Sequence, residues 1–445
     1  MQDKILELLK EKKYLEVKKI LSQEKTVDIA EILNDVSDEF LPICFRILPK
    51  DTAADVFSYM DSDSQEKLIK TFSDSELKEI INDLYVDDAA ALIEEMPSNV
   101  VKRILRSADP EMRKSINMLL QYPKNSAGSI MTTEYVSLKR DMTVSDAFDK
   151  IRKYGVDSET IYTAYITSKN RRLIGTVSAK TLLLSDMNSK IEDIMDSNFV
   201  SVATTEDKEA VADLFMKYDL LALPVVDAEN RFVGIVTVDD AIDVVQDEAT
   251  EDIEAMAAIV PTDKTYIKTG VFETFLKRIP WLLILMVSAT FAGSIIRNYE
   301  NALQNGYVIL TAFIPMLMGT GGNCGSQAST SVIRAISLGE ITIKNIFSVI
   351  WKEIRVAFLC GVTLAIANFA KLMLVDRVSF EVSLVVCLTL VITVFLAKFI
   401  GCVLPILAKA IKLDPAVMAS PFITTILDAI SLIAYFNIAT AVLGI

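Results

Sequence analysis

The sequence predicts a multi-domain protein with an all-α superhelical N-terminal domain, two tandem α/β domains, a connecting helix and five transmembrane α-helices. Three observations predict this fold class. Helix starts recur about every 12 residues near the N-terminus, a pattern of β-branched runs and helices occurs twice in the middle, and long apolar spans fill the C-terminal part. The predicted domain ranges are 1–125, 126–190, 191–247, 248–276 and 277–445.

The N-terminal domain is predicted from its short amphipathic segments, most of which open with a polar capping residue or a neighbouring proline. Because the starts are regularly spaced, we expect stacked helices that each bury an apolar stripe against the next one. The predicted starts lie near Ser37, Lys50, Asp63, Ser73, Asp87, Ser98 and Asp109.

The middle of the chain contains a duplicated unit. The run Arg172–Ser178 matches Arg231–Thr237 at an offset of 59 positions, and the dipeptide Ile130-Met131 recurs as Ile194-Met195. This β-α-β-β-α unit resembles a tandem pair of CBS domains, a family of adenosine-nucleotide sensors. The resemblance implies an α/β fold for both units.

One of the two units also resembles the CBS family at its nucleotide motif. Residues 237–240 match the family's Thr-x-x-Asp, whose aspartate binds a ribose, whereas the first unit has Ser178 and Thr181 and lacks the aspartate. The resemblance therefore implies that Thr237 and Asp240 are the better candidate nucleotide-binding residues, with ATP as the candidate ligand. A purely structural module is the alternative.

Charge divides the chain into two parts. Residues 1–276 hold 33 Lys and Arg against 52 Asp and Glu, a net charge of -19, while the remaining residues hold 12 against 7, a net charge of +5. This acidity argues against nucleic acid as a partner, since phosphate binding requires a basic face. The chain has no histidine, so any metal must be held by oxygen ligands, which favour hard cations such as Mg²⁺.

Five apolar spans predict a multi-pass protein of the plasma (inner) membrane, embedded in a lipid bilayer. They are Ile279–Ile296, Tyr307–Ile333, Val356–Ala370, Val382–Ala408 and Ala419–Leu443, with Lys398 interrupting the fourth. No cleavable signal peptide opens the chain, and Lys and Arg concentrate on one set of flanks. The positive-inside rule therefore predicts a cytosolic N-terminus and an external C-terminus.

The last span carries the only acidic or basic side chain after Pro415, which is Asp428. An ionised aspartate in hydrocarbon costs at least about 2.5 kcal/mol, so such a residue usually faces a wet pathway, a counter-ion or a transported cation. Ser420, Thr424 and Asp428 recur at helical spacing, and Pro421 frees a backbone carbonyl upstream. We interpret these oxygens as ligands of a hydrated divalent cation; a neutral aspartate bonded to a neighbouring helix is the alternative.

The second span contains a glycine-rich segment, Pro315–Gln327, that weakens a straight helix. We expect the helix to open there and its polar groups, including Asn323, Ser326 and Gln327, to line a cavity. Close packing of small residues between helices is the alternative.

Together these motifs resemble the MgtE family of magnesium channels and transporters, and the resemblance covers nearly the whole chain. In family order they are Tyr-Pro-x-x-Ser-Ala-Gly at 122–128, the two CBS units, Glu-Ala-Thr-Glu-Asp at 248–252, Gly-Thr-Gly-Gly-Asn at 319–323 and Pro-x-x-Thr-Thr-x-x-Asp at 421–428. The resemblance implies a homodimer that passes Mg²⁺ inward without an enzymatic step, through a pore lined by the second and fifth spans. The implied pore residues are Asp428, Ser420, Thr424, Asn323 and Gly322.

The resemblance also implies that cytosolic Mg²⁺ closes the pore by binding between the N-terminal domain, the CBS units and the connecting (plug) helix. Electrostatics supports this, because an assembly of net charge -19 repels itself unless cations lie between its carboxylates. The implied sensor residues are Asp55, Asp87, Asp207, Glu209, Asp219, Asp240, Asp243, Glu248, Glu251 and Asp252.

Two positions depart from the family pattern. Ala91 stands where a further acid is expected, which leaves the number of sensor ions open, and Ser420 stands where an asparagine is expected at the pore mouth. Two other functions also stay open: a proton-coupled divalent-cation exchanger in which Asp428 carries protons, and a membrane-anchored nucleotide-sensing scaffold. The sequence leaves the choice among Mg²⁺, Mn²⁺ and Co²⁺ undecided.

Overall fold

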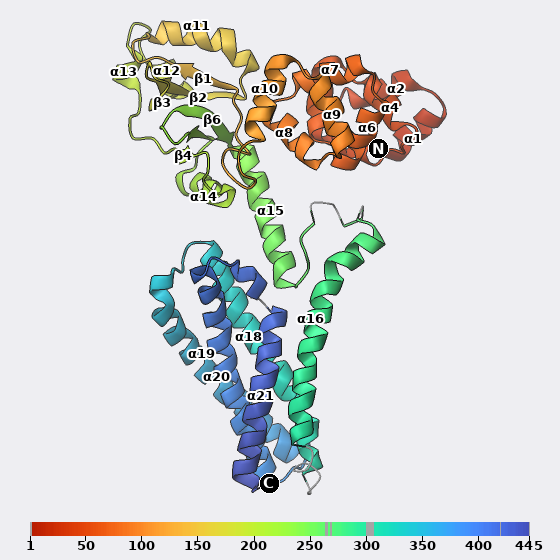
Figure 1. Ribbon diagram of the computed structural model, residues 1–445, viewed down its shortest axis with the longest axis vertical. Helices are drawn as coiled ribbons and strands as arrows, with labels where there is room; N and C mark the ends of the chain where they lie inside the picture. Colours follow the sequence, from red (N-terminus) through yellow and green to blue (C-terminus); the bar gives the residue numbers. More distant parts are fainter. Residues whose placement is uncertain (1, 263–265, 268, 300–306, 419, 445) are drawn as a thin grey trace. The chain divides into compact units, whose positions relative to one another are not determined.

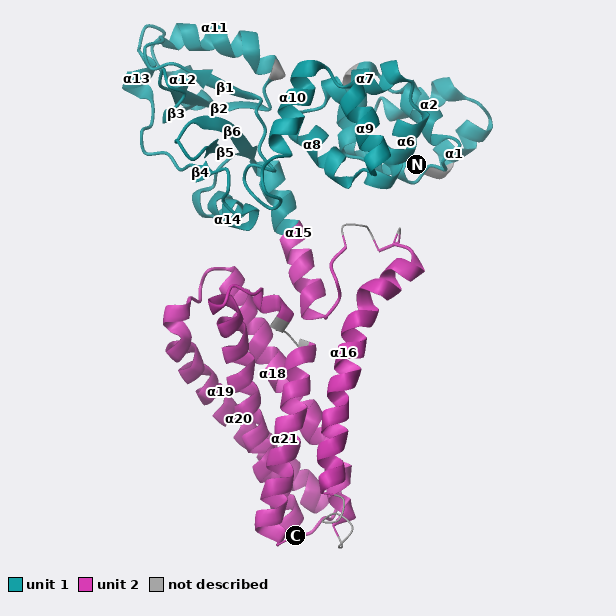
Figure 2. Cartoon of the chain, viewed as in Figure 1, with its two compact units in different colours: residues 1–246 teal, residues 247–445 magenta. Residues whose placement is uncertain are grey.

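The computed structural model describes residues 2–262, 266–267, 269–299, 307–418 and 420–444 (Figure 1). The chain forms two compact units, residues 1–246 and residues 247–445 (Figure 2). The first unit contains a helical domain followed by two α/β domains, and the second contains the membrane-length helices. The predicted fold class is confirmed.

The N-terminal domain is a succession of short α-helices. Their bounds are α1 Gln2–Lys10, α2 Tyr14–Leu21, α3 Thr26–Asn34, α4 Leu41–Ile47, α5 Lys50–Ser58, α6 Ser62–Thr71, α7 Asp74–Asp83, α8 Val86–Glu95, α9 Ser98–Ser107 and α10 Pro110–Leu119. Most starts agree with the sequence prediction, but the helix predicted near Ser37 begins at Leu41. Side chains cap two of these helices: Asp61 accepts from the Ser64 N–H on α6, and Ser73 and Glu76 form a reciprocal capping box on α7. Inside the array, the rings of Phe45 and Phe72 pack 5.3 Å apart in a continuous apolar core.

Two three-stranded sheets follow, each with one parallel and one antiparallel pair. The first domain comprises β1 Tyr135–Leu138, α11 Val144–Tyr154, β2 Thr160–Thr167, β3 Leu173–Ser178 and α12 Ala179–Leu184. The second comprises α13 Ile191–Ile194, β4 Val202–Ala203, α14 Lys208–Tyr218, β5 Ala222–Val226, β6 Phe232–Thr237 and the start of α15 Val238–Met256. The predicted duplication is therefore present in the fold.

The repeated dipeptides connect the two α/β domains to each other. Met131, which precedes β1, packs on Gly234 of β6, while Met195, which precedes β4, packs on Gly175 of β3. A Cβ at Gly234 would lie 2.7 Å from the Met131 sulfur, so this close approach requires glycine. In each α/β domain, the strand glycine therefore contacts the methionine of the other domain. This reciprocal contact explains why glycine and methionine recur together in the two repeats.

The connecting segment differs from the prediction. The sequence predicts a connecting range of 248–276, with an acidic helical stretch from Gln246 to Val260 that Pro261 closes. Instead α15 continues directly from the second α/β domain and ends at Met256, while α16 begins at Val271. The ending is a Schellman motif: Ala258 has a φ of 56°, and the Ile259 N–H donates to the Glu254 carbonyl at 2.9 Å.

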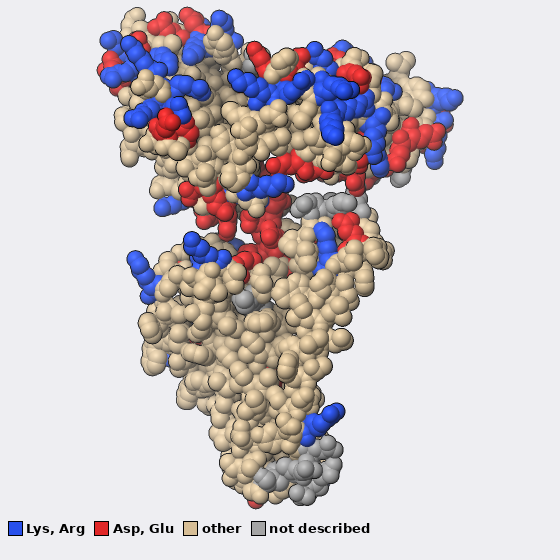
Figure 3. Space-filling view, viewed as in Figure 1, with Lys and Arg blue, Asp and Glu red and all other residues tan. Residues whose placement is uncertain are grey.

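Five helices of the described chain are long and apolar enough to cross a membrane. They are α16 Val271–Asn298, α18 Ile314–Ser337 with the preceding 3₁₀ turn η2 Val308–Phe313, α19 Ile346–Leu374 after η3 Ile343–Asn345, α20 Phe380–Ala410, and α21 Ser420–Leu443 after η4 Pro415–Met418. In Figure 3 the surface of these helices is almost free of charged side chains, whereas acidic side chains gather along α15.

The expected opening of the second span at its glycines is wrong, because α18 is helical from Ile314 to Ser337. Three of its glycines, Gly321, Gly322 and Gly325, instead let neighbouring helices approach closely, whereas Gly319 has nothing within 4 Å. A Cβ at Gly322 would lie 2.9 Å from the Thr424 methyl group, and one at Gly401 of α20 would lie 2.5 Å from the Gly325 carbonyl oxygen. Small-residue packing, the alternative interpretation, therefore accounts for these glycines.

Candidate functional site

A group of buried carboxylates in the first unit lies where the helical domain meets the α/β domains. We define it as the acidic cluster: Asp87 and Asp88 in the first turn of α8, Glu134 before β1, Glu159 before β2, and Asp239 and Asp240 in the first turn of α15. One carboxylate oxygen each from Asp87, Glu134 and Glu159 lies within 4.8 Å of the other two. Three carboxylates at this spacing fit a shared hard cation.

Backbone geometry brings these carboxylates together. The Val86 N–H at the start of α8 donates to Glu134 Oε2 at 3.2 Å, and the Glu159 N–H donates to the Glu134 carbonyl at 2.8 Å. The Thr237 hydroxyl donates to Asp240 Oδ2 at 2.6 Å and holds that side chain at the start of α15. Helix starts and strand starts from three sequence regions therefore converge.

Burial and mutual repulsion disfavour the ionised forms of the carboxyl groups in the acidic cluster. Burial, followed by the charge of Asp240, raises the pKa of Asp87 well above its ordinary value. Burial raises the pKa of Glu159 to about 8 and that of Asp240 to about 7, although the bond from Thr237 opposes the second shift. Burial and the charge of Asp239 raise the pKa of Asp88 to about 6.

Basic side chains do not offset this repulsion in the part of the chain that the structure describes. Among the described residues, no lysine or arginine lies within ion-pair distance of Asp87, Glu159 or Asp240. Asp87 Oδ1 and Glu159 Oε2 are buried and have no hydrogen-bond partner in that part of the chain. Such groups must either take up protons or bind a cation.

Of the sensor residues predicted from the sequence, Asp87 and Asp240 meet in this cluster, and the charge of Asp55 acts on neighbouring Asp88. Sequence reasoning missed Glu134 and Glu159. The only available signal was that each acid directly precedes a β-branched or aromatic run that begins a strand, so both lie at the same sheet edge.

Other predicted sensor residues lie elsewhere. Asp207 caps α14 by accepting a hydrogen bond from the Glu209 N–H at 2.9 Å, and Asp219 ends the same helix with a φ of 52°. Asp243 lies one turn beyond Asp240 on α15. Among the interactions found for the acidic cluster in the described chain, none involves Asp207, Glu209 or Asp219.

A second acidic group lies in the other unit, at the end of α15. The Ser337 hydroxyl at the end of α18 donates to Asp252 at 3.3 Å. Burial, then the nearby charge of Asp414, raises the pKa of Asp252, and Glu248 contributes in the same direction. Ala255 and Met256 pack against Ile333 and Ala416 beside it. The predicted Glu251 is exposed on the same helix, whereas Asp414 was not predicted.

The predicted nucleotide residues Thr237 and Asp240 are hydrogen-bonded to each other within the acidic cluster. A separate cleft of about 520 Å³ lies between the two α/β domains, and its lining includes Ser178, Thr181 and three tyrosines, Tyr162, Tyr165 and Tyr218. The cleft thus opens at the unit that lacks the ribose-binding aspartate.

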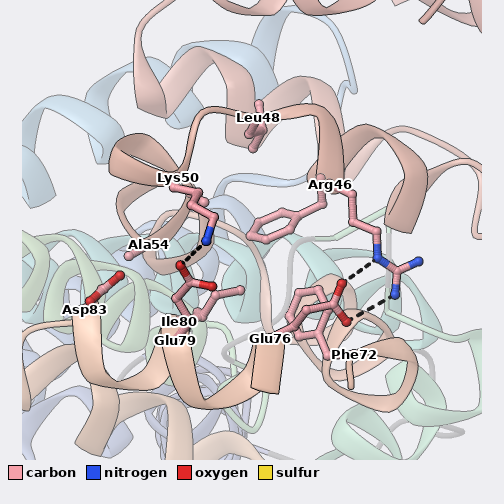
Figure 4. Close-up of a pocket in the computed structure, with 11 residues that line it drawn as sticks. Arg46, Leu48, Lys50, Ala54, Phe72, Glu76, Glu79, Ile80 and Asp83 are labelled. Atoms are coloured by element: carbon pink, nitrogen blue, oxygen red, sulfur yellow. Dashed lines mark hydrogen bonds and ion pairs between the residues drawn. The ribbon is translucent and has the colours of Figure 1, made fainter. Parts of the chain in front are cut away.

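A pocket between α4, α5 and α7 has no comparable chemistry (Figure 4). Four of its five charged residues form two pairs: Arg46 Nε lies 2.8 Å from Glu76 and Lys50 Nζ lies 2.6 Å from Glu79, while Asp83 lies apart from both. The bond from Arg46 lowers the pKa of Glu76 to about 2. None of the predicted site residues lines this pocket, so it is not a candidate site.

In the membrane unit, one face of α18 is polar or small at every fourth position. We call this face the α18 stripe: Pro315, Gly319, Asn323, Gln327 and Ser331, all of which are exposed. A polar stripe on a membrane helix requires water or protein against it rather than lipid.

Two of the predicted pore residues, Gly322 and Thr424, meet where α18 contacts α21, whereas Asn323 is exposed. Gly322 touches the Thr424 methyl group, and the Thr424 hydroxyl donates to the Pro421 carbonyl at 2.9 Å. Asp428 is half-buried one turn further and has no hydrogen-bond or ion-pair partner among the described residues. The Ser420 side chain lies outside the described part of the structure.

A bundle of five membrane helices with a polar stripe and an aspartate that has no ion-pair partner among the described residues, joined to a domain with a buried acidic cluster, is the arrangement expected of a divalent-cation transporter. Family models agree with this class. The model described as a divalent cation transporter (MgtE) matches residues 314–438, that of the MgtE intracellular N domain matches 24–125, and that of the CBS domain matches 127–187 and 191–247.

Relatives extend the match to nearly the whole chain. The chain is 34% identical over 435 residues to the magnesium transporter MgtE of Thermus thermophilus, covering 96% of this chain and 95% of that protein. It is 32% identical over 438 residues to the Bacillus subtilis magnesium transporter MgtE, covering 98% and 96%. The chain therefore belongs to the MgtE family of magnesium transporters, and its predicted family is confirmed.

Solved structures resemble the first unit. A crystal structure of the cytosolic domain of the Mg²⁺ channel MgtE in complex with ATP has 33% identity and a TM-score of 0.52, and covers 55% of this chain and all of that one. The soluble part of a magnesium transporter gives 29% identity and the same TM-score. The protein is thus a multi-pass magnesium transporter with a cytosolic N-terminal domain.

Proposed function

We propose that the protein is a homodimeric Mg²⁺ channel of the plasma membrane, which takes up Mg²⁺ and closes when cytosolic Mg²⁺ is plentiful. The observation that carries the pore is the exposed α18 stripe, in the same bundle as the half-buried Asp428, because exposed polar groups at membrane depth require a water-filled path or a second copy of the chain. Two copies meeting along α18 and α21 provide both.

Pore chemistry follows from the residues on this contact. Asp428 supplies the charge, and Thr424 and Asn323 supply neutral oxygens close to Gly322. We propose that Ser420 lies at the mouth. Mg²⁺ sheds water reluctantly, so these oxygens act on its water shell rather than replacing all of it.

Uptake requires no coupled ion. A divalent cation that moves inward down a membrane potential of about 100 mV gains roughly 4.6 kcal/mol. The N-terminus is cytosolic, and an odd number of spans would leave the C-terminus outside. Manganese and cobalt ions stay open as further cargo, since their sizes are close to that of Mg²⁺.

Gating rests on the two acidic groups. Without Mg²⁺, the carboxylates of the acidic cluster repel one another, and a bound cation removes that repulsion. We propose that Mg²⁺ also binds at Asp252 and Asp414 where α15 contacts the end of α18, with Glu248, Glu251 and Asp243 contributing along the helix. We propose that Asp207, Glu209 and Asp219 form further cation sites.

Uptake by purified protein in liposomes tests the pore. Replacement of Asp428 by alanine should abolish voltage-driven Mg²⁺ uptake, whereas replacement of the lipid-exposed Leu359 by alanine should leave it unchanged. Undiminished uptake by the Asp428 variant would reject the assigned pore. Protease cleavage near residues 257–262 tests gating, because chelating Mg²⁺ should accelerate it.

The proton-coupled exchanger makes a different prediction in the same liposomes: a pH gradient alone would drive Mg²⁺ movement. A scaffold without transport is not proposed, because the family is one of transporters.

We propose ATP as a modulator, on the basis of the cleft between the α/β domains and the ATP complex of the similar cytosolic domain. Either the cleft beside Tyr162 or the predicted pair Thr237 and Asp240 receives the nucleotide. Calorimetric titration separates them: Tyr162→Ala weakens binding in the first case, and Thr237→Ala weakens it in the second.

A further inference from the structure

The membrane unit contains a buried ion pair away from Asp428. Lys398 of α20 is 5% exposed, and its Nζ lies 4.0 Å from Glu353 Oε2 of α19, whose side chain is 13% exposed. Glu353 Oε2 has no hydrogen-bond partner among the described residues. The pair is therefore close enough to balance charge but does not form a closed, fully hydrogen-bonded salt bridge.

The pair is buried between two helices of the membrane-spanning unit. At 1.5 Å per residue, Lys398 is about 18 Å from the end of α20 at Ala410. Glu353 is about 10 Å from the start of α19 at Ile346, so the pair lies toward the end of the bundle where α19 begins and α20 ends. Charges at such positions mark ion pathways far more often than they stabilise a fold, since an apolar pair of similar volume is often as stable.

The two charges face the α18 stripe. They line a hollow together with Lys352 and Val356 of α19 and with Ser326, Gln327, Thr330 and Ser331 of α18, of which Gln327 and Ser331 belong to the stripe. Lys352 is exposed, so its charge is screened more strongly than that of the buried Lys398. The hydroxyl and amide groups of this wall can bond the remaining ammonium donors directly or through water. The hollow thus connects the ion pair to the surface that the proposed pore uses.

We infer that Lys398 and Glu353 form a charge-balanced pair that sets the electrostatic potential along the α18 stripe and thereby the occupancy of the pathway by Mg²⁺. This inference rests on the proposed pore. The Lys398 ammonium alone would repel a divalent cation, and the Glu353 carboxylate alone would attract and retain it. Conduction requires that the pathway bind Mg²⁺ strongly enough for the ion to enter and weakly enough for it to leave. With both charges present, the affinity for Mg²⁺ lies between these two extremes.

Single and double variants in liposomes test the inference through the Mg²⁺ concentration that gives half-maximal uptake. Glu353→Gln should raise this concentration by about tenfold, because the ammonium is left uncompensated. Lys398→Met should lower it by a similar factor and reduce the maximal rate, because the carboxylate retains the ion. The double variant should return to within about threefold of the wild type, since the two effects cancel.

Two controls separate charge from folding. Lys371 and Asp376 form an exposed pair at 2.9 Å in the same unit, so Lys371→Met and Asp376→Asn should leave the half-maximal concentration unchanged. Lys398→Arg keeps the charge and should behave like the wild type. If a single variant folds poorly, the charge-neutral double variant and Lys398→Arg still test the prediction.

The experiment distinguishes failure of the inference about Lys398 and Glu353 from failure of the pore assignment. Half-maximal concentrations that shift in the same direction for both single variants, or that do not shift, overturn the inference while Asp428→Ala still abolishes uptake. If Asp428→Ala leaves uptake intact, the pore assignment itself fails.

Discussion

The backbone N–H of Val86 donates to the Glu134 side chain at 3.2 Å, so a carboxylate from the first CBS domain caps the helix of the N-terminal domain that carries Asp87 and Asp88. The acidic cluster is thus also an interdomain joint. A cation that binds Asp87, Glu134 and Glu159 would act on both domains at once.

Two substitutions of Glu134 should separate its cap from its charge. Glu134→Gln keeps an acceptor for the Val86 N–H but removes one repelling charge, so the Mg²⁺-free protein should become more stable at pH 8. Glu134→Ala removes the cap as well and should be about 1 kcal/mol less stable than Glu134→Gln. Hydrogen exchange of the α8 amides measures both effects; equal protection in the two variants would rule out the capping role.

Stability of the Mg²⁺-free first unit should fall as pH rises. Burial holds the pKa values of Glu159 and Asp240 at about 8 and about 7, above the unfolded value near 4, so the folded state keeps protons that the unfolded state releases. The stability is fully present below pH 4 for these groups and is lost as pH rises through 7 to 8.

Mg²⁺ should reverse this loss. At pH 8 it should raise the melting temperature of the first transition by at least about 3 °C, and it should do so much less at pH 5.5, where protons already neutralise the cluster. Scanning calorimetry with and without a chelator measures the difference. Glu159→Gln should weaken the pH 8 response, whereas the exposed Glu111→Gln should not; a response that is independent of pH would contradict the cluster as the binding site.

Close packing of α18 on α20 should make Gly401 intolerant of a side chain. A Cβ there would meet the Gly325 carbonyl oxygen at 2.5 Å, and backbone cannot yield as a side chain can. We expect Gly401→Ala to cost about 2 kcal/mol in thermal unfolding in detergent. Gly293→Ala on α16, where nothing lies within 4 Å, is the control and should unfold like the wild type.

The α18 stripe should lie at the contact between two copies. A cysteine in place of Asn323 should be joined to its counterpart by a short bifunctional thiol reagent, giving a covalent dimer on a denaturing gel. A cysteine at Leu359, which is exposed on α19, should give no more dimer than the native cysteines alone. Equal cross-linking at both positions would remove the evidence for a specific interface.

Local sequence signals predicted the helices and the strand repeats well, because capping residues and periodicity act within a few positions. These signals failed where contacts between residues far apart in the sequence determine the local structure. Glycines in α18 were expected to open the helix, but their intrinsic penalty of about 1 kcal/mol each is offset by the close approach of α20 and α21. The end of α15 at Met256 likewise depends on the left-handed Ala258 rather than on Pro261.

The same distinction between local signals and long-range contacts applies to the residues of the candidate sites. Motif resemblance predicted Asp87 and Asp240, yet Glu134 and Glu159 were missed, because neither stands in a motif and the two meet only when β1 and β2 pair. The membrane ion pair gave one sequence signal, Lys398 within an apolar span, and its partner Glu353 became apparent only from the packing of α19 on α20.

Electrical recording from the purified protein in a planar bilayer tests the central claim most directly. With Mg²⁺ as the only permeant cation, the current should reverse at the Mg²⁺ equilibrium potential, ignore a pH gradient, and decline as Mg²⁺ is raised on the side of the N-terminal domain. A current that appears only with a proton gradient, or that does not respond to Mg²⁺ on that side, would contradict a magnesium channel closed by its own ion.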